Sequence, residues 1–258
     1  MLTRFAILAA VFLSAEFWKM KVIGIIPSRF ASSRFPGKPL VDIGGKTMIQ
    51  RVYEQATKAR VLNEVVVATD DERIYNEVKR FGGHVLMTSP THLNGTERCA
   101  EVVSKPHYGD FDVVINIQGD EPFIQPEQIN LLAGCFMDTA VEIATLVRLF
   151  ANEAEKANPS RVKAFTDKQM NALTFSRSAS PERLSSYYRI FKHIGLYAFR
   201  KHVLTEVVKL PYSALEKAES LEQLRWLDNG YRIHCELTDS ESISIDTPDD
   251  LQAALKSL

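Results

Sequence analysis

The sequence predicts an α/β fold in which helices cover a mostly parallel sheet. Short apolar runs alternate with helical patterns through the first 150 residues, as in βαβ units. The run Glu64–Thr69 is continuously apolar after its first residue, which is typical of a strand buried on both faces. Asp110–Ile117 carries the strongest strand signal in the chain. With 258 residues, of which 45% are hydrophobic, the chain can bury a sizeable core.

In the first half, most strands are followed by a helix with recognisable ends. Gly44 and Gly45 form a turn before the first helix, Asp70 and Asp71 cap the second, and Pro126 stands near the first turn of a later one. The predicted elements are strand Lys21–Pro27, helix Lys46–Ala59, strand Glu64–Thr69, a helix ending at Phe81, strand His84–Met87, a helix ending at Ser104, strand Asp110–Ile117, helix Pro126–Met137 and strand Glu142–Leu149.

From Ala151 onward the pattern loosens and predicts a smaller, mixed sheet. A polar loop is expected at Ser176–Arg189, and Thr247 with Pro248 begins a final helix. The other predicted elements are strands Ser160–Phe165, Ala172–Phe175, Phe191–Phe199 and Arg232–Glu236, and helices His202–Lys209 and Leu215–Asn229.

Composition excludes several classes of protein. The chain has 31 basic and 32 acidic residues and a net charge of −1, which gives no electrostatic case for nucleic acid or an anionic membrane. The three cysteines, Cys99, Cys135 and Cys235, include no C-x-x-C pair, so neither a zinc framework nor a disulfide framework is expected. This cysteine usage indicates a reducing compartment.

The loop that follows the first strand is suited to phosphate. Arg29, Arg34 and Lys38 stand among Ser28, several other small residues and Gly37. Small residues let backbone N–H groups approach an anion, and the cations neutralise its charge. The alternative is a solvated basic loop. Three cations at the mouth of a first strand favour the phosphate interpretation.

Two carboxylates are predicted to lie at the same edge of the sheet. Asp120 follows the strand Asp110–Ile117, and Asp246 directly precedes the final helix. Ligands of open α/β sheets bind outside the carboxyl ends of the strands, and two carboxylates there can hold Mg²⁺ together with substrate phosphates. Each residue alone has a simpler interpretation, as a turn residue for Asp120 and as a supplementary helix cap for Asp246.

The motifs of several other nucleotide and hydrolytic enzymes are missing. The first loop is not G-x-x-x-x-G-K-[ST], and no G-x-G-x-x-G follows the first strand. No Ser, His and Asp set stands at a nucleophile elbow. The chemistry that fits is phosphoryl or nucleotidyl transfer by positioning and charge neutralisation.

From about Lys21 to its end, the chain resembles the 3-deoxy-manno-octulosonate (Kdo) cytidylyltransferases, also called CMP-Kdo synthetases. The motifs that carry the resemblance are IIPSRFASSRFPGKPL (25–40), ATDDERI (68–74), NGTER (94–98), NIQGDEP (116–122), FSRS (175–178), KHIGLYAFR (192–200), LEQLR (221–225) and IDTPDDL (245–251). The resemblance implies a nucleotidyltransferase-type three-layer fold with a Rossmann-like sheet. It also implies transfer of CMP from CTP to the anomeric hydroxyl of Kdo, with release of pyrophosphate, in lipopolysaccharide biosynthesis.

The resemblance also implies roles for individual residues. Asp120 and Asp246 would hold Mg²⁺, and Arg29 and Lys38 would stabilise the developing phosphate charge. The expected nucleotide-binding residues are Pro27, Ser28, Arg29, Arg34, Lys38, Thr88, Asn94, Gly95 and Arg98. For Arg98 the alternative is a surface ion pair with a helical neighbour such as Glu101.

The expected sugar-binding residues are Gln118, Arg177, His193, Tyr197, Glu222 and Gln223. Arg177 or His193 would supply the cation for the sugar carboxylate, and the others would bond its hydroxyls. Singly, His193 and Tyr197 could instead be core residues. The segment Ser178–Pro181 departs from the family's usual sequence near the expected sugar pocket, so a close Kdo analogue stays an alternative.

Two other functions stay open at this stage. A cytidylyltransferase for another acid sugar, such as a sialic acid, is the nearest enzymatic one, although PGKPL (36–40) argues against it. The other is a catalytically silent nucleotide- or sugar-binding protein, against which the intact Arg29, Lys38, Asp120 and Asp246 argue.

We expect one cytidylyltransferase domain over residues 20–258. Residues 20–150 would bind the nucleotide, residues 151–240 would bind the sugar and form a homodimer, and the last helix would return to the first part. Within residues 1–19, the apolar run Phe5–Leu13 resembles a short signal-peptide core. Met20 offers a second start, however, and a nucleotide substrate favours the cytoplasm. Residues 1–19 are therefore expected to lie outside the fold.

Overall fold

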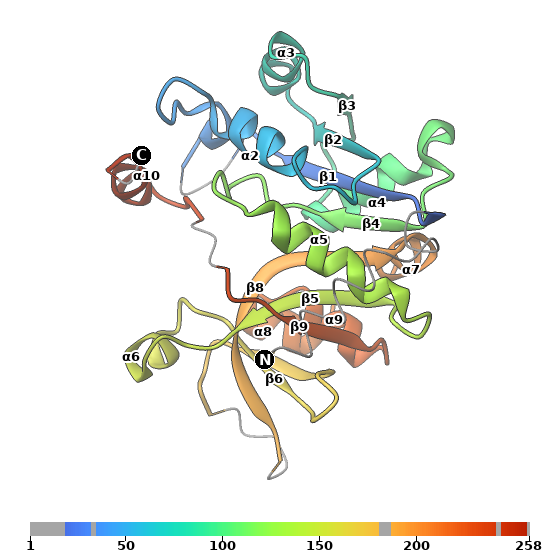
Figure 1. Ribbon diagram of the computed structural model, residues 1–258, viewed down its shortest axis with the longest axis vertical. Coiled ribbons are helices and arrows are strands. Elements are labelled where there is room, and N and C mark those ends of the chain that lie inside the picture. Colours follow the sequence, from blue (N-terminus) through green and yellow to red (C-terminus); the bar gives the residue numbers. More distant parts are fainter. Residues whose placement is uncertain (1–18, 32–34, 181–186, 241–243, 257–258) are drawn as a thin grey trace.

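The computed structural model describes residues 19–31, 35–180, 187–240 and 244–256 (Figure 1). Its centre is one sheet of nine strands with the order β3-β2-β1-β4-β8-β5-β9, and β6 and β7 lie off this path. The strands are β1 (Val22–Ser28), β2 (Glu64–Thr69), β3 (Val85–Met87), β4 (Val113–Asn116), β5 (Ile143–Arg148), β6 (Lys163–Thr166), β7 (Ala172–Ser176), β8 (Arg189–Arg200) and β9 (Ile233–Leu237).

The first four strands form the parallel part that the sequence predicts. β1 pairs with both β2 and β4, and β3 pairs with the other side of β2. All three pairings are parallel. The long strand β8 then runs antiparallel to β4 and to β5, and β9 is parallel to β5. β6 and β7 pair antiparallel, and β6 joins this hairpin to the first residues of β8. The smaller group of strands is therefore continuous with the main sheet.

Helices lie on both faces of the sheet (Figure 1). α2 and α5 cover one face, and α4, α7 and α9 pack against the other, each face having its own apolar cluster. The helices are α2 (Met48–Ala56), α3 (Glu72–Arg80), α4 (Gly95–Ser104), α5 (Pro126–Gly134), α6 (Glu153–Ala157), α7 (Lys201–Val207), α8 (Ala214–Glu219), α9 (Gln223–Asp228) and α10 (Pro248–Leu255), with 3-10 turns η2 (Lys38–Leu40), η3 (Pro106–Tyr108) and η4 (Cys135–Met137).

The predicted helix Leu215–Asn229 is wrong in one respect, because it is two short helices. Ser220 adopts a left-handed conformation with φ of 54° and ends α8. A non-glycine residue in this region is uncommon, so the apolar spacing on either side gave no sign of the break. As a result, Glu222 stands at the beginning of α9.

The C-terminal helix returns to the N-terminal part of the fold (Figure 1). Ile245, Leu251 and Ala254 form a small apolar cluster with Ile43 and Met48. Thr247 and Asp250 form a capping box that fixes where α10 begins. This packing brings the segment before α10 to the carboxyl end of β1.

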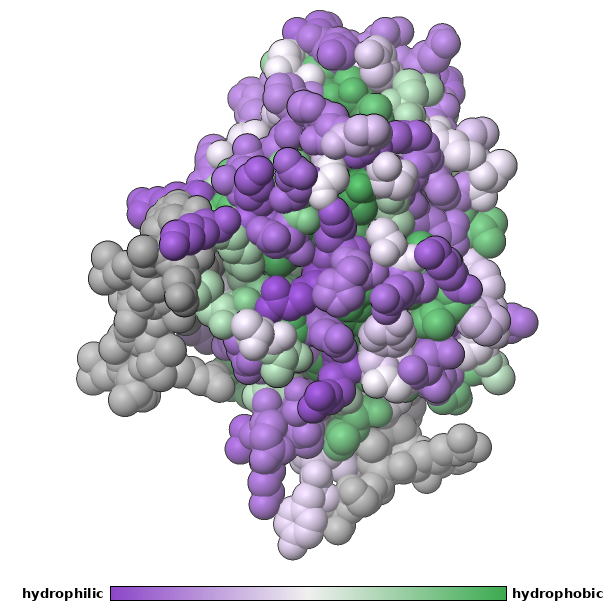
Figure 2. All heavy atoms as spheres, turned by 90° about the vertical axis from the view of Figure 1, so that its right-hand side faces the viewer, coloured by the Kyte–Doolittle hydropathy of each residue, from purple (hydrophilic) through white to green (hydrophobic). Residues whose placement is uncertain are grey.

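Hydrophilic residues cover most of the face that Figure 2 shows, and hydrophobic residues lie there in separate spots. Among the described helices, none has both the length and the apolar character needed to cross a bilayer.

Candidate active site

The site is built where the parallel strands β1 and β4 end side by side. The amide of Ile117 donates to the carbonyl of Ile25 at 2.8 Å, which extends the pairing past the end of β4. Gly119 then passes so close to β1 that a Cβ atom on it would lie 3.0 Å from the Pro27 carbonyl oxygen. A side chain here would push against the backbone of β1, so glycine suits this close approach, which leads the chain to Asp120 beside the basic loop.

Lys38 joins the two predicted carboxylates. Its Nζ lies 2.7 Å from Asp120 Oδ2 and 3.2 Å from Asp246 Oδ1. The three side chains are 12%, 27% and 34% exposed, respectively, so the cluster is partly shielded yet open to solvent. The amide of Ile245 also donates to the Asp120 carbonyl at 2.9 Å, which holds the two acidic segments together.

The basic loop is shaped to bring Lys38 to this position. Gly37 has φ of 72°, and its amide donates to the Phe30 carbonyl at 3.0 Å, which closes the loop. Pro39 at the beginning of η2 is buried and anchors the turn that carries Lys38. The Arg73 guanidinium lies 3.2 Å from the centre of the Phe30 ring and covers it.

Of the other two cations of the loop, the structure describes the contacts of Arg29 but not those of Arg34. Arg29 donates to the backbone carbonyl of His92, which links the loop to the segment before α4. His92 is itself held by Glu101, with Nε2 2.6 Å from the carboxylate. Arg34 lies outside the described residues.

The predicted nucleotide-binding residues of β1 and α4 come together at the end of β1. A Cβ atom on Gly95 would lie 2.9 Å from Pro27 Cγ, so the first turn of α4 packs directly on the strand end. The Asn94 side chain caps α4 by accepting from the Glu97 amide at 2.8 Å. Ser28 is buried beside them.

Arg98 lies behind this surface rather than on it. Its side chain is fully buried, donates to Thr88 Oγ1 and lies 3.2 Å from Asp70 Oδ2. Burial is the main cause that lowers the pKa of Arg98, and the nearby Arg29 adds to the shift. The alternative of a surface ion pair with Glu101 is wrong, because Glu101 bonds Ser89, His92 and Lys105 instead.

The predicted sugar-binding residues lie around α9 and the middle of β8. Glu222 accepts from Thr96 Oγ1 at 2.9 Å, which ties α9 to the first turn of α4. Burial raises the pKa of Glu222 to about 7, against the opposing effect of the Thr96 hydrogen bond. Gln223 is buried next to it, and Gln118 is half-buried just beyond β4.

Burial disfavours the charged form of His193, the other candidate cation for the sugar carboxylate. Burial lowers its pKa to about 3, so the ring is neutral at physiological pH. Its Nε2 lies 3.0 Å from Thr145 Oγ1, and its ring packs between those of Phe175 and Tyr197. Tyr197 is also a core residue, edge-on to the Trp226 ring.

Arg177 is the exposed member of this group. Its Nε donates to the Glu219 carbonyl at 3.1 Å and its amide to the Glu219 carboxylate at 3.0 Å, so it lies beside the end of α8. A guanidinium there can pair with a carboxylate through two parallel hydrogen bonds.

Sequence reasoning missed Asp70 and Thr96 as members of this constellation. Asp70 is the partner of Arg98, and Thr96 is the partner of Glu222. Thr96 stands in the motif NGTER, between Gly95 and Arg98, and Asp70 stands in the motif ATDDERI, where the sequence predicts it as a helix cap. Their place in those motifs was the available signal.

Comparison with known proteins identifies the family of the chain. The cytidylyltransferase family profile matches residues 23–233. The 3-deoxy-manno-octulosonate cytidylyltransferase of Parabacteroides distasonis is 54% identical over 247 residues, covering 92% of this chain and 97% of that protein. The chain belongs to the 3-deoxy-manno-octulosonate cytidylyltransferase family. The Bacteroides thetaiotaomicron member is also 54% identical, over 91% of this chain and 97% of its own length.

A solved structure extends the agreement to the fold. The structure of CMP:2-keto-3-deoxy-manno-octonic acid synthetase in complex with CTP superposes on the present chain with a TM-score of 0.83. The two are 42% identical, over 92% of this chain and 98% of that one. The α/β fold with a nucleotidyltransferase-type sheet is therefore confirmed.

Proposed function

We propose that the protein transfers CMP from CTP to 3-deoxy-D-manno-octulosonate, giving CMP-Kdo and pyrophosphate. The observation that carries the proposal is the contact of Lys38 with both Asp120 and Asp246 at the carboxyl ends of β1 and β4. Ligands of open α/β sheets bind at this edge. The relatives of the chain are named for this activity, and one is a complex with CTP.

The triphosphate of CTP would lie along the basic loop. Arg29 and Lys38 flank the end of β1 and would neutralise its charge, with Arg34 as a third cation. The base and ribose would occupy the surface next to α4, where Pro27, Ser28, Asn94 and Gly95 meet and where Arg98 supports Thr88 from behind. Arg98 is thus a positioning residue.

Asp120 and Asp246 would hold Mg²⁺. Two half-exposed carboxylates that already converge on one cation form the hard oxygen donor set that this ion prefers. The ion would supply charge neutralisation at the α-phosphate and a lower pKa for the sugar hydroxyl. Lys38 would then turn from the carboxylates to the phosphates.

The reaction is an in-line displacement at the α-phosphorus. The anomeric oxygen of the sugar forms the new bond to phosphorus and loses its proton, while the bond from phosphorus to the bridging oxygen of the β-phosphate breaks. Pyrophosphate leaves with the bonding electron pair. Lys38 and Arg29 stabilise the charge that develops on it.

The acid sugar would bind on the α9 side of the site. Arg177 is the stronger candidate for its carboxylate, because burial disfavours the charged form of His193. Gln118, Tyr197, Glu222 and Gln223 are the candidates for its hydroxyls, and a hydrogen bond from Thr96 orients the Glu222 carboxylate. Since its pKa is near 7, Glu222 can accept or donate a hydrogen bond at physiological pH.

The setting of this activity is also part of the proposal. CMP-Kdo would serve lipopolysaccharide synthesis, the enzyme would act in the cytoplasm, and residues 151–240 would form a homodimer. A cytidylyltransferase for a Kdo analogue or another acid sugar is the alternative. A non-catalytic binding protein is the other, and it would bind CTP without turnover.

A pyrophosphate-release assay over four nucleotides and a panel of acid sugars tests the proposal. We expect release only with CTP and most rapidly with Kdo. A sialic acid as the preferred substrate would favour the alternative sugar, and CTP binding without release would favour the binding protein. Release with any nucleotide equally would contradict the assigned cytidine site.

A further inference from the structure

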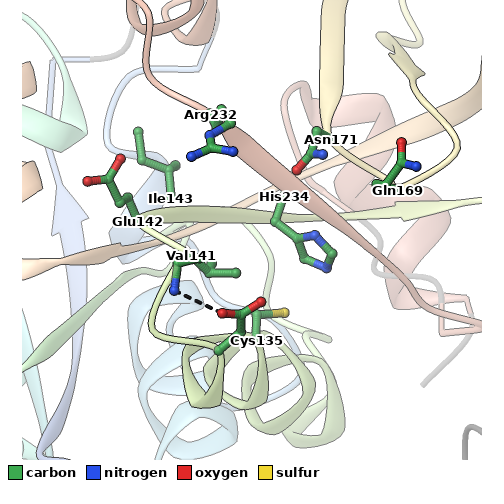
Figure 3. A pocket seen from close by; sticks show the side chains of 10 residues that line it. Cys135, Val141, Glu142, Ile143, Gln169, Asn171, Arg232 and His234 are labelled. Carbon is green, nitrogen blue, oxygen red and sulfur yellow. Dashed lines mark hydrogen bonds between the residues drawn. The ribbon is translucent and has the colours of Figure 1, made fainter.

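A second site lies around a cavity of about 320 Å³ beside β5 and β9 (Figure 3). None of the residues that line it belongs to the cluster around Lys38. They are Cys135, Asp138, Ala140, Val141, Glu142, Ile143, Gln169, Asn171, Arg232 and His234. Polar and charged side chains predominate, although the neighbouring core is apolar.

Two of the lining side chains, Cys135 and His234, lie close to a third side chain of different chemistry, Glu236. One ligand atom each from Cys135, His234 and Glu236 lies within 4.8 Å of the others. His234 Nε2 is already 3.2 Å from Glu236 Oε2. Figure 3 shows the His234 ring and the Cys135 side chain approaching the same space from β9 and from the end of α5.

The fold holds the three residues in place. β9 alternates, so Ile233 and Cys235 are buried while His234 and Glu236 share the other, half-buried face. Cys135 is the first residue of η4, directly after α5, and its Sγ lies 3.6 Å from the Leu131 carbonyl oxygen. The ligands thus come from β9 and from the turn that directly follows α5.

We propose that Cys135, His234 and Glu236 bind a divalent transition metal ion of borderline softness, with Zn²⁺ as the best match. A thiolate, an imidazole and a carboxylate are the ligands that Zn²⁺ takes in proteins, whereas Mg²⁺ prefers oxygen alone. Bond lengths of about 2.0–2.3 Å to zinc put tetrahedral ligand atoms roughly 3.3–3.8 Å apart, so small side-chain movements complete the site.

The fourth coordination position would face the cavity and hold water or a small anion. On binding, the Cys135 thiol releases its proton and the sulfur bonds the metal as a thiolate. The ion would link η4 to β9. β9 is the last strand in the main strand order of the sheet. The ion would therefore attach this strand to the segment that follows α5.

Cobalt titration of the full chain, freed of metal by chelation, tests the site. Co²⁺ bound to a thiolate gives a charge-transfer absorption in the near ultraviolet, and the carboxylates around Lys38 cannot produce this band. We expect the band with one equivalent of Co²⁺ and its loss on addition of Zn²⁺. Cys135→Ser should abolish it. His234→Gln should weaken Co²⁺ binding by more than the roughly 10- to 100-fold that loss of a supporting partner costs.

Cys99→Ala is the matched control, because Cys99 is a buried cysteine on another element. The Cys99→Ala variant should keep the Co²⁺ band. The Cys135→Ser variant should keep the pyrophosphate release and the circular dichroism spectrum of the wild type. A band that persists in Cys135→Ser, or a wild-type chain that gives none, would overturn the site. Because the band is independent of turnover, this result and that of the pyrophosphate assay are separable.

Discussion

Lys38 and Asp246 lie 208 positions apart in the sequence, yet Lys38 Nζ and Asp246 Oδ1 are 3.2 Å apart. The contact depends on α10, which returns to pack on Ile43 and Met48. The same ammonium is 2.7 Å from Asp120. The Lys38 ammonium thus joins the basic loop, the segment after β4 and the segment before α10. Substitution of Lys38, Asp120 or Asp246 tests this arrangement.

Lys38→Ala should lower kcat by about 100- to 1,000-fold, because Lys38 is assigned to charge that develops in the transition state. The KM for Kdo should change much less. Steady-state kinetics with both substrates varied provide the measurement. Lys46→Ala is the control, since Lys46 pairs with Glu54 among the described residues, away from the site, and should keep full activity. A change confined to sugar affinity would disprove the assigned role.

Removal of Mg²⁺ with a chelator should abolish pyrophosphate release, and readdition of Mg²⁺ should restore it. Asp120→Asn should lose activity without unfolding, because Asp120 is partly exposed at the site. Mg²⁺ with CTP should raise the melting temperature of the wild type and not of Asp120→Asn. Asp110→Asn, at the fully exposed Asp110, is the control. Turnover like the wild type in Asp120→Asn would refute the metal assignment.

Glu222 should make the protein less stable as pH rises. Burial raises its pKa to about 7, above the ordinary value of about 4.3 in the unfolded chain. The folded state therefore binds more protons between these values, and its stability falls as pH rises through them. Glu222→Gln removes this loss. Between pH 5 and pH 8, its free energy of unfolding should rise relative to that of the wild type by roughly 2–3 kcal/mol.

Urea unfolding at both pH values measures this difference. Glu153→Gln is the control, because Glu153 is 88% exposed, and its curve should run parallel to that of the wild type. A parallel curve for Glu222→Gln as well would show that Glu222 titrates normally.

The buried pair of Glu216 and Arg225 should be essential for the position of α9. Arg225 Nε donates to Glu216 Oε2 at 2.7 Å, and both side chains are buried. Glu216→Ala leaves a buried cation unpaired and should cost about 3–5 kcal/mol in urea unfolding. Glu153→Ala removes only an exposed pair with Lys156 and should cost no more than about 1 kcal/mol. Equal costs would contradict the packing.

The regular part of the fold was predictable from the sequence. The continuous apolar run of β2 indicated a strand buried on both faces, and Thr247 with Pro248 indicated where α10 begins. Such signals are local, because they depend on side-chain periodicity and on helix capping. The break at Ser220 was not predictable, since a left-handed backbone at a non-glycine residue is uncommon and side-chain periodicity does not indicate it.

The candidate site was predictable as a set of residue types, but its internal contacts were not. Arg29, Lys38, Asp120 and Asp246 follow strand ends or precede a helix, which places them at one edge. The neutral state of His193 depends instead on burial among Phe175 and Tyr197. Burial is set by residues distant in sequence, and no spacing in KHIGLYAFR reveals it. The proximity of Cys135 to His234 likewise depends on how distant segments pack, and no local spacing reveals it.

Pyrophosphate release from CTP and Kdo by Asp246→Asn, beside Asp249→Asn, tests the central claim most directly. The two aspartates are three residues apart at the beginning of α10, but only Asp246 contacts Lys38. We predict that Asp246→Asn loses at least about 100-fold in kcat, while Asp249→Asn keeps the wild-type rate. Equal activity in the two variants would contradict the account.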